Sequence, residues 1–141
     1  MKMTIKNALL IPLCLLLGLA TAQADILVVA SASSPVSSLT ESQVKQLFTG
    51  VLHEVAGEKL TPVDLPETST ARDDFYKAIA GRTAQQMRAY WTRLIFTGRG
   101  TPPATASESE LPIRLKANPE LVSYLPDTAN TDGLVVLARI R

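Results

Sequence analysis

The sequence predicts an α/β layered domain, in which strands alternate with helices and the chain ends in a pair of strands. Three observations support this fold class. An apolar run at residues 26–30 is typical of a buried strand, several stretches carry apolar residues at helical spacing, and two more apolar runs cover residues 121–125 and 134–140. No internal repeat or low-complexity linker divides the 141 residues, so we expect one domain.

The first 24 residues predict a secretory signal peptide. Lys2 and Lys6 precede a mostly apolar stretch at residues 8–20, which is 13 residues long and thus shorter than the ~20 apolar residues of a membrane-spanning helix. Ala22 and Ala24 fit the A-x-A cleavage rule, so we expect a signal peptide at residues 1–24 and a mature domain at residues 25–141. We therefore expect a periplasmic protein of a Gram-negative host.

Composition narrows the function classes. Without the leader the chain has 12 basic and 13 acidic residues, and a net charge of −1 predicts no global attraction to nucleic acid or anionic lipid. Cys14 lies in the leader after the bulky Leu13, which disfavours lipoprotein processing, and His53 is the single histidine. We expect no metal site, no cofactor and no enzymatic activity, since the Gly-x-Ser-x-Gly, Walker and Gly-x-Gly-x-x-Gly motifs are all absent.

The first helix is predicted from a signal at its start. Residues 40–43, Thr-Glu-Ser-Gln, fit a capping box, and Leu39 is placed to form a hydrophobic staple with Val44. Gly50 suits the end of this helix. The apolar positions recur at helical spacing: Val44, Leu47 and Phe48.

A strand and a second helix are predicted next. Residues 51–59 are polar and irregular, and residues 60–65 then predict a strand, in which Pro62 must lie at the start or at an edge. The second helix follows Pro66 and ends at Gly81. Its buried face is predicted to hold Phe75, Ala78 and Ile79.

Two further helices are predicted in the second half of the chain. Residues 83–86 fit another capping box, which opens the helix with the broadest apolar stripe. That stripe comprises Ala84, Met87, Tyr90, Trp91, Leu94 and Ile95. Residues 107–110 fit a third capping box before a helix that reaches about Ala117, with Pro112 near its start.

The start of the second helix is a candidate anion site. It holds three hydroxyl residues, Thr68, Ser69 and Thr70, and free N–H groups and the positive end of the helix dipole favour an anion at such a place. Arg72 follows in the first turn, where a cation is disfavoured unless a negative group lies beside it. That group is either a bound oxyanion or a carboxylate such as Asp73 or Asp74. An ordinary cap with a surface salt bridge is the alternative.

A second cluster of hydroxyls follows the first strand, where open α/β sheets tend to bind ligands at the carboxyl ends of strands. It comprises Ser31, Ser33, Ser34, Ser37 and Ser38. If this loop lies at the same sheet edge as residues 68–70, Ser33 and Ser34 would complete the oxyanion pocket. A flexible serine-rich loop is the alternative.

The order of these pieces resembles the phosphate-binding proteins of phosphate ABC transporters, and more closely their short, single-domain periplasmic relatives. Residues 39–50 match the helix Leu-x-x-x-Gln-(Leu/Val)-x-x-(Ile/Leu)-Phe-x-Gly of those relatives. Residues 118–125 keep part of the family's Asn-Pro-Gly-x-Ile-Gly-Tyr-Val element. The most specific match is to a Tyr-Trp-x-x-x-Ile-Phe-Thr-Gly-x-Gly-x-Pro-Pro segment, through Tyr90, Trp91, residues 95–98, Gly100, Pro102 and Pro103.

The resemblance implies a single lobe of the type II periplasmic-binding-protein-like fold, with a mixed sheet flanked by helices. It also implies binding of phosphate or a similar oxyanion without catalysis, and an ABC transporter permease, another periplasmic protein or a second copy of the chain as partner. In the family's Arg-x-x-Gly-Ser-Gly-Thr segment, Ser69 matches the serine, whereas Leu65 and Ala71 stand at the arginine and threonine. The predicted ligand-binding residues are Ser69, Thr70, Arg72, Thr68, Ser33 and Ser34.

An interaction module is the alternative function. The two glycines that flank the family's serine are replaced here, and 117 mature residues are enough for one lobe only. The same lobe would then serve as a ligand-free periplasmic adaptor or accessory subunit.

Overall fold

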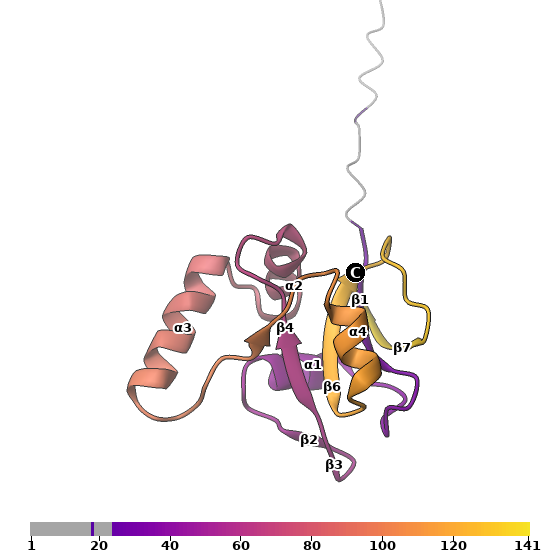
Figure 1. The fold of residues 1–141 in the computed structure, drawn as a ribbon. Coiled ribbons are helices and arrows are strands. Elements are labelled where there is room, and N and C mark those ends of the chain that lie inside the picture. Colours follow the sequence, from indigo (N-terminus) through magenta and orange to yellow (C-terminus); the bar gives the residue numbers. More distant parts are fainter. Residues whose placement is uncertain (1–17, 19–23) are drawn as a thin grey trace, which may run out of the picture.

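The computed structural model describes Gly18 and residues 24–141, so the predicted signal peptide lies outside the described residues apart from Gly18 and Ala24. Residues 26–140 form a mixed α/β domain (Figure 1). Its helices are α1 (Glu41–Phe48), α2 (Thr70–Ala80), α3 (Ala84–Phe96) and α4 (Leu111–Ala117). Its strands are β1 (Ile26–Ser31), β2 (Glu54–Val55), β3 (Glu58–Lys59), β4 (Thr61–Asp64), β5 (Ala104–Thr105), β6 (Leu121–Pro126) and β7 (Leu134–Ile140).

The direction of one strand decides which loops can meet. The main sheet has the order β5-β4-β6-β1-β7. β4 runs parallel to both β5 and β6, whereas β1 runs antiparallel to both β6 and β7. β1 therefore points opposite to the other four strands, and its carboxyl end lies at the opposite edge of the sheet from that of β4.

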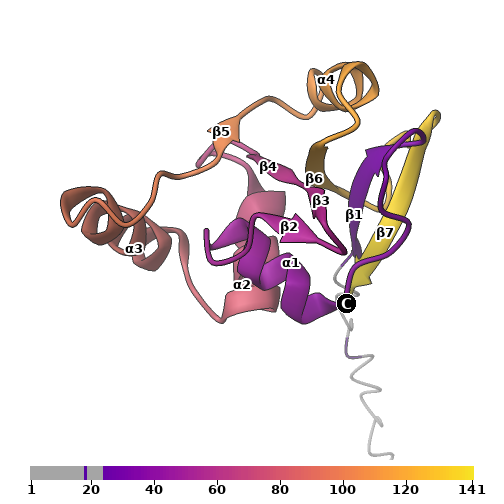
Figure 2. The same ribbon diagram turned by 90° about the horizontal axis from the view of Figure 1, so that it is seen from below.

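Helices cover both faces of this sheet (Figure 2). α1 and α2 lie on one face and α4 lies on the other, while α3 packs against α2 beyond the β5 end of the sheet. Successive side chains of a strand point to opposite faces of the sheet. Neighbouring cross-strand residue pairs of β1 and β6 therefore face different helix layers. Val28 and Tyr124 form one such pair, and Leu27 and Leu125 form the next.

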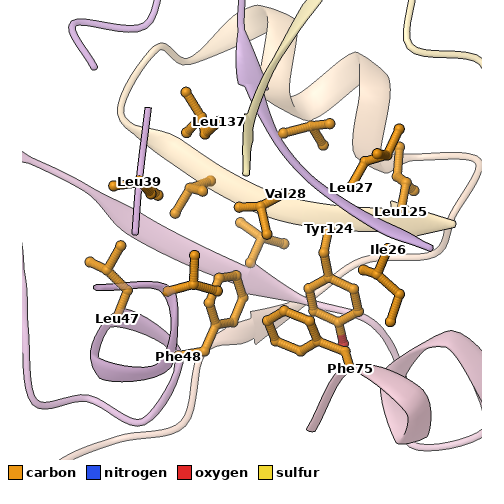
Figure 3. Close-up of a cluster of buried hydrophobic side chains, with 14 of the residues drawn as sticks. Ile26, Leu27, Val28, Leu39, Leu47, Phe48, Phe75, Tyr124, Leu125 and Leu137 are labelled. Carbon is orange, nitrogen blue, oxygen red and sulfur yellow. The ribbon is translucent and has the colours of Figure 1, made fainter. Parts of the chain in front are cut away.

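Three aromatic rings form the centre of the core between the sheet and the α1–α2 layer (Figure 3). Phe75 of α2 stacks on Tyr124 of β6, with ring centroids 3.7 Å apart. Phe48 of α1 meets the rings of Phe75 and Tyr124 edge-on at 4.8 and 5.5 Å. Such pairs add about 0.5–1.5 kcal/mol each beyond the burial of their apolar area, so this cluster fixes α1 and α2 on the sheet.

The structure confirms the predicted caps of α1 and α3 and the predicted end of α2. Thr40 and Gln43 form a reciprocal capping box on α1, with N–H···O distances of 2.9 and 3.1 Å, and Thr83 caps α3 in the same way. Gly81 ends α2 in the left-handed conformation, at φ +62°. Pro62 lies in the first half of β4, before pairing with β5 begins at Val63, so its missing N–H breaks no hydrogen bond on that side.

Several sequence predictions were wrong because neighbouring elements were not foreseen. Residues 51–59 are not wholly irregular, since β2 and β3 form a hairpin there around Ala56 and Gly57, both at positive φ. The last two strands do not pair with each other, because β1 lies between them. The third capping box does not open α4: Ser107 accepts from the Glu110 N–H, but the helix begins only at Leu111.

The predicted apolar stripe of α3 is buried at only two positions. Met87 and Trp91 are buried, whereas 55% of Ile95 is exposed. Ala84, Tyr90 and Leu94 are half-buried, and Ala78 of α2, also predicted to face the core, is exposed. The reason is that α3 packs against α2 rather than across the sheet, so no further layer of the described domain covers the rest of its apolar face.

The two phenylalanines Phe75 and Phe96 provide a matched test of this packing. Phe75→Ala should lower the free energy of unfolding by about 3–5 kcal/mol, because it leaves a cavity beside Tyr124. Phe96→Ala should change it by less than about 0.5 kcal/mol, since 92% of Phe96 is exposed. Urea unfolding followed by circular dichroism measures both values, and equal losses would contradict the described core.

Candidate functional site

Asp64 is a buried carboxylate at the carboxyl end of β4, and only 2% of the residue is exposed. Its Oδ1 accepts hydrogen bonds from the Leu65 N–H, at 2.8 Å, and from the Tyr124 hydroxyl. Its Oδ2 accepts from the Tyr76 hydroxyl at 2.7 Å and from Arg72 Nε at 3.3 Å. One donor is the backbone N–H of Leu65, two belong to α2 and one belongs to β6. Their hydrogen bonds to the carboxylate offset the unfavourable free energy of burying its negative charge.

The buried charge shifts the pKa values of its partners. Burial raises the pKa of Tyr76 and of Tyr124 far above the ordinary tyrosine value, and the negative charge of Asp64 raises both further. Burial by itself would lower the pKa of Arg72, but the charge of Asp64, the hydrogen bond to it and the two nearby tyrosines together outweigh this and raise it. Both tyrosines therefore stay neutral donors, and Arg72 stays a cation.

Arg72 is the predicted site residue whose surroundings differ most from expectation. The negative group that faces it is neither Asp73 nor Asp74 of its own helix but Asp64 of β4. Arg72 is 6% exposed, so the surface salt bridge considered as an alternative is in fact a buried ion pair. Its Nη1 atom is buried and has no hydrogen-bond partner within the described part of the chain.

The predicted hydroxyl residues do not gather around Arg72. Ser69 is the N-cap of α2 and accepts from the Arg72 N–H at 3.4 Å, whereas Thr68 and Thr70 are exposed. Ser33 and Ser34 follow β1 and so lie at the opposite edge of the sheet. Within that loop the Ser33 N–H donates to Ser31 Oγ, and Ser34 Oγ accepts from the Val36 N–H. The two serine loops therefore do not converge on one ligand.

Arg72 instead lines a pocket at the carboxyl ends of β4 and β5. The pocket has a volume of about 270 Å³. The wall that faces Arg72 is formed by α3 and by the segment that follows α3. Two buried donors without hydrogen-bond partners among the described residues belong to lining residues: Arg72 Nη1 and the indole Nε1 of Trp91. The lining residues are Asp64, Glu67, Arg72, Arg88, Trp91, Thr92, Ile95, Pro102, Pro103 and Thr105.

A second ion pair lies at this pocket. Arg88 of α3 donates from Nη2 to Glu67 Oε2, and both side chains are at least half exposed. The hydrogen bond from Arg88, together with its charge, lowers the pKa of Glu67. Because this pair is open to water, its partners can exchange readily with solvent or with a ligand.

Sequence reasoning missed Asp64, Glu67 and Arg88 as pocket residues. The usable signal was that an arginine in the first turn of a helix needs a negative neighbour, and this signal pointed to the right residue type. It could not point to β4, because only the fold brings Asp64 beside Arg72.

Solved structures with a similar fold are known, although the sequence itself matches little. No protein-family model matches the sequence, and neither does any curated protein. A solved structure described as a phosphate ABC transporter substrate-binding protein with bound phosphate, from Clostridium perfringens, is similar at a TM-score of 0.63. It is 15% identical in sequence, over 81% of this chain and 45% of that chain.

An ABC-type phosphate transport receptor from Vibrio cholerae is similar at a TM-score of 0.62, with 14% identity over 81% of this chain and 46% of that one. The chain has the fold of these receptors. The predicted fold class, a mixed sheet flanked by helices as in periplasmic binding proteins, is thereby confirmed. The chain spans about half the length of both receptors.

The described residues hold neither a membrane-spanning helix nor a cluster of metal ligands. No helix among them is long and apolar enough to span a membrane. Within the same part of the chain, no group of three or more histidine, cysteine, aspartate or glutamate residues is placed to hold a metal ion.

The raised pKa values of Tyr76 and Tyr124 predict a loss of stability in alkali. In the unfolded chain both ionise near pH 10, whereas the fold keeps them protonated. The stabilisation is therefore complete below pH 10 and is lost as the pH rises above it, by up to about 1.4 kcal/mol per pH unit for each tyrosine. Urea unfolding between pH 8 and 11 measures the slope.

Tyr124→Phe serves as the control for this prediction. The variant should be less stable at neutral pH by about 1.5–3 kcal/mol, because Asp64 loses a donor. Its loss of stability above pH 10 should nevertheless be shallower, since one ionising group is gone. An unchanged slope would show that the alkaline loss comes from other groups.

Proposed function

We propose that this protein is a periplasmic substrate-binding-like protein that binds an oxyanion of the phosphate class without catalysis. The observation that carries the proposal is that Arg72 lines a pocket at the carboxyl end of β4, while its buried Nη1 has no hydrogen-bond partner among the described residues. A buried donor without a partner is destabilising by about 1–3 kcal/mol, and an oxyanion in the pocket would remove that penalty. The shared fold of the two phosphate receptors supports the same role.

Asp64 prepares Arg72 for this role. It accepts from Nε on one edge of the planar guanidinium and so leaves Nη1 available for a ligand. The guanidinium is already held in place before binding, so little side-chain entropy is lost when an oxyanion arrives. Ser69 contributes by capping α2 at the N–H of Arg72 itself, which fixes the start of the helix.

Arg88 supplies the second positive charge of the proposed site. Its guanidinium pairs with Glu67, whose carboxylate has the same charge sign and the same hydrogen-bonding edge as an oxyanion. An incoming oxyanion would displace Glu67 from Arg88 and bridge the two arginines. Thr68 and Thr70 do not line the pocket, and in this proposal Ser33 and Ser34 take no part.

The proposed cellular setting follows from the predicted signal peptide and from the fold. Export to the periplasm would place the protein where oxyanions enter the cell envelope. An ABC transporter permease or another periplasmic protein would then be the partner that receives the ligand.

A second candidate function is the ligand-free adaptor. The observation that favours it is the apolar end of α3, where Ile95 is 55% and Phe96 is 92% exposed. Calorimetric titration with inorganic phosphate separates the two functions. Saturable binding supports the receptor role, whereas no binding heat and an unshifted melting temperature support the adaptor.

Arg88 and Arg93 offer a matched pair of variants on α3. Arg88→Gln should weaken phosphate binding by at least about tenfold, since a hydrogen-bonded charge pair is typically worth about 1.5–3 kcal/mol. Arg93→Gln removes the same charge from the same helix outside the pocket and should leave the affinity unchanged. Equal losses would mean that net charge, and not this site, attracts phosphate.

Removing the internal competitor should have the opposite effect. Glu67→Gln takes away the carboxylate that occupies Arg88 and should tighten phosphate binding severalfold. Because both side chains are exposed, the melting temperature without ligand should change little. Weaker binding by Glu67→Gln would show that Glu67 holds the ligand or orients Arg88 instead of competing.

A further inference from the structure

The pocket beside Arg72 has two chemically different walls. The wall opposite α3 carries the charged groups Asp64, Glu67 and Arg72, and Arg88 of α3 adds a further charge where it meets Glu67. The other is largely apolar and comes from α3 and the chain that follows it, with the side chains of Trp91, Ile95, Pro102 and Pro103. A site for a small, fully hydrated ion has no need of such an apolar wall.

The volume also exceeds what inorganic phosphate requires. The pocket measures about 270 Å³, which approaches the lower end of the ~300–1,000 Å³ typical of sites for organic ligands. A water molecule takes about 30 Å³ of liquid volume, so a phosphate, with four oxygens around one phosphorus, leaves much of the pocket unfilled. The space that remains adjoins the apolar wall.

Trp91 gives this wall a fixed shape. The residue is 5% exposed, and its ring meets the ring of Tyr90 edge-on at 5.2 Å. Gly50 lies against it so closely that a Cβ at this position would come within 3.1 Å of the indole. Gly50 also has φ +76°, which favours glycine, so the close approach is built into the end of α1.

The charges at the pocket are already partly balanced. Arg72 is paired with Asp64, and Arg88 is paired with Glu67. Charge attraction for a small dianion is therefore modest until Glu67 is displaced, and contact with the apolar wall would supply binding free energy of a second kind. Both sources act together only on a ligand that is anionic at one end and apolar at the other.

We infer that the ligand is a phosphoryl oxyanion that carries an apolar substituent, such as an organic phosphonate or a phosphate monoester. This inference rests on the oxyanion site proposed above. The phosphoryl oxygens accept from Arg72 Nη1 and from Arg88, and the substituent lies against Trp91, Ile95 and the two prolines.

Calorimetric titration of the purified protein with phosphate, methylphosphonate and phenylphosphonate tests the inference. Phenylphosphonate should bind at least about tenfold more tightly than phosphate, with methylphosphonate between them. If phosphate binds and phenylphosphonate binds no better, the inference is overturned while the oxyanion site stands. If none of the three binds, the oxyanion site itself is overturned, and the inference with it.

A matched pair of isoleucine variants, together with Arg88→Gln, locates the bound ring. Ile95→Ala should reduce the preference for phenylphosphonate over phosphate severalfold, whereas Ile113→Ala, which truncates an isoleucine exposed on α4, should leave it unchanged. Arg88→Gln should weaken both ligands. If Arg88→Gln leaves phenylphosphonate affinity unchanged, the ring binds elsewhere on the protein and the inference is overturned.

Discussion

The carboxylate of Asp64 joins β4 to α2, the next element along the chain, and to β6, which lies 60 residues further on at Tyr124. It ends β4, accepts from Arg72 and Tyr76 of α2, and accepts from Tyr124 of β6. A charge buried to this degree is tolerated only when donors surround it, so α2 and β6 must both be in place for β4 to end as it does. The same Tyr124 ring stacks on Phe75, which makes the polar cluster continuous with the aromatic core.

This cluster serves the pocket as well as the fold. The helix dipole disfavours a cation in the first turn of α2, so Arg72 is stabilised there by a negative partner. Asp64 supplies that partner by accepting from Nε, and Nη1 of this pocket-lining residue has no hydrogen-bond partner among the described residues. The same ion pair therefore joins α2 to the end of β4 and holds Arg72 at the pocket.

The pocket depends equally on α3, which is attached to the rest of the domain mainly through α2 (Figure 1). Arg88, Trp91 and Ile95 recur along one side of α3 and form the wall that faces Arg72. Ile95, a residue of the apolar stripe that the core leaves exposed, lines the pocket instead.

Local chemistry in the sequence was sufficient to predict the caps of α1 and α3, the left-handed end of α2 at Gly81, and the alternation of strands and helices. These features depend on residues within one or two turns of each other, so neighbouring sequence carries the whole signal. The tertiary structure alone decided that β1 runs against the other four strands, which separates Ser33 and Ser34 from Ser69. It alone placed Asp64 beside Arg72, and Glu67 beside Arg88, because pairings between distant residues depend on strand direction and helix packing that no local pattern contains.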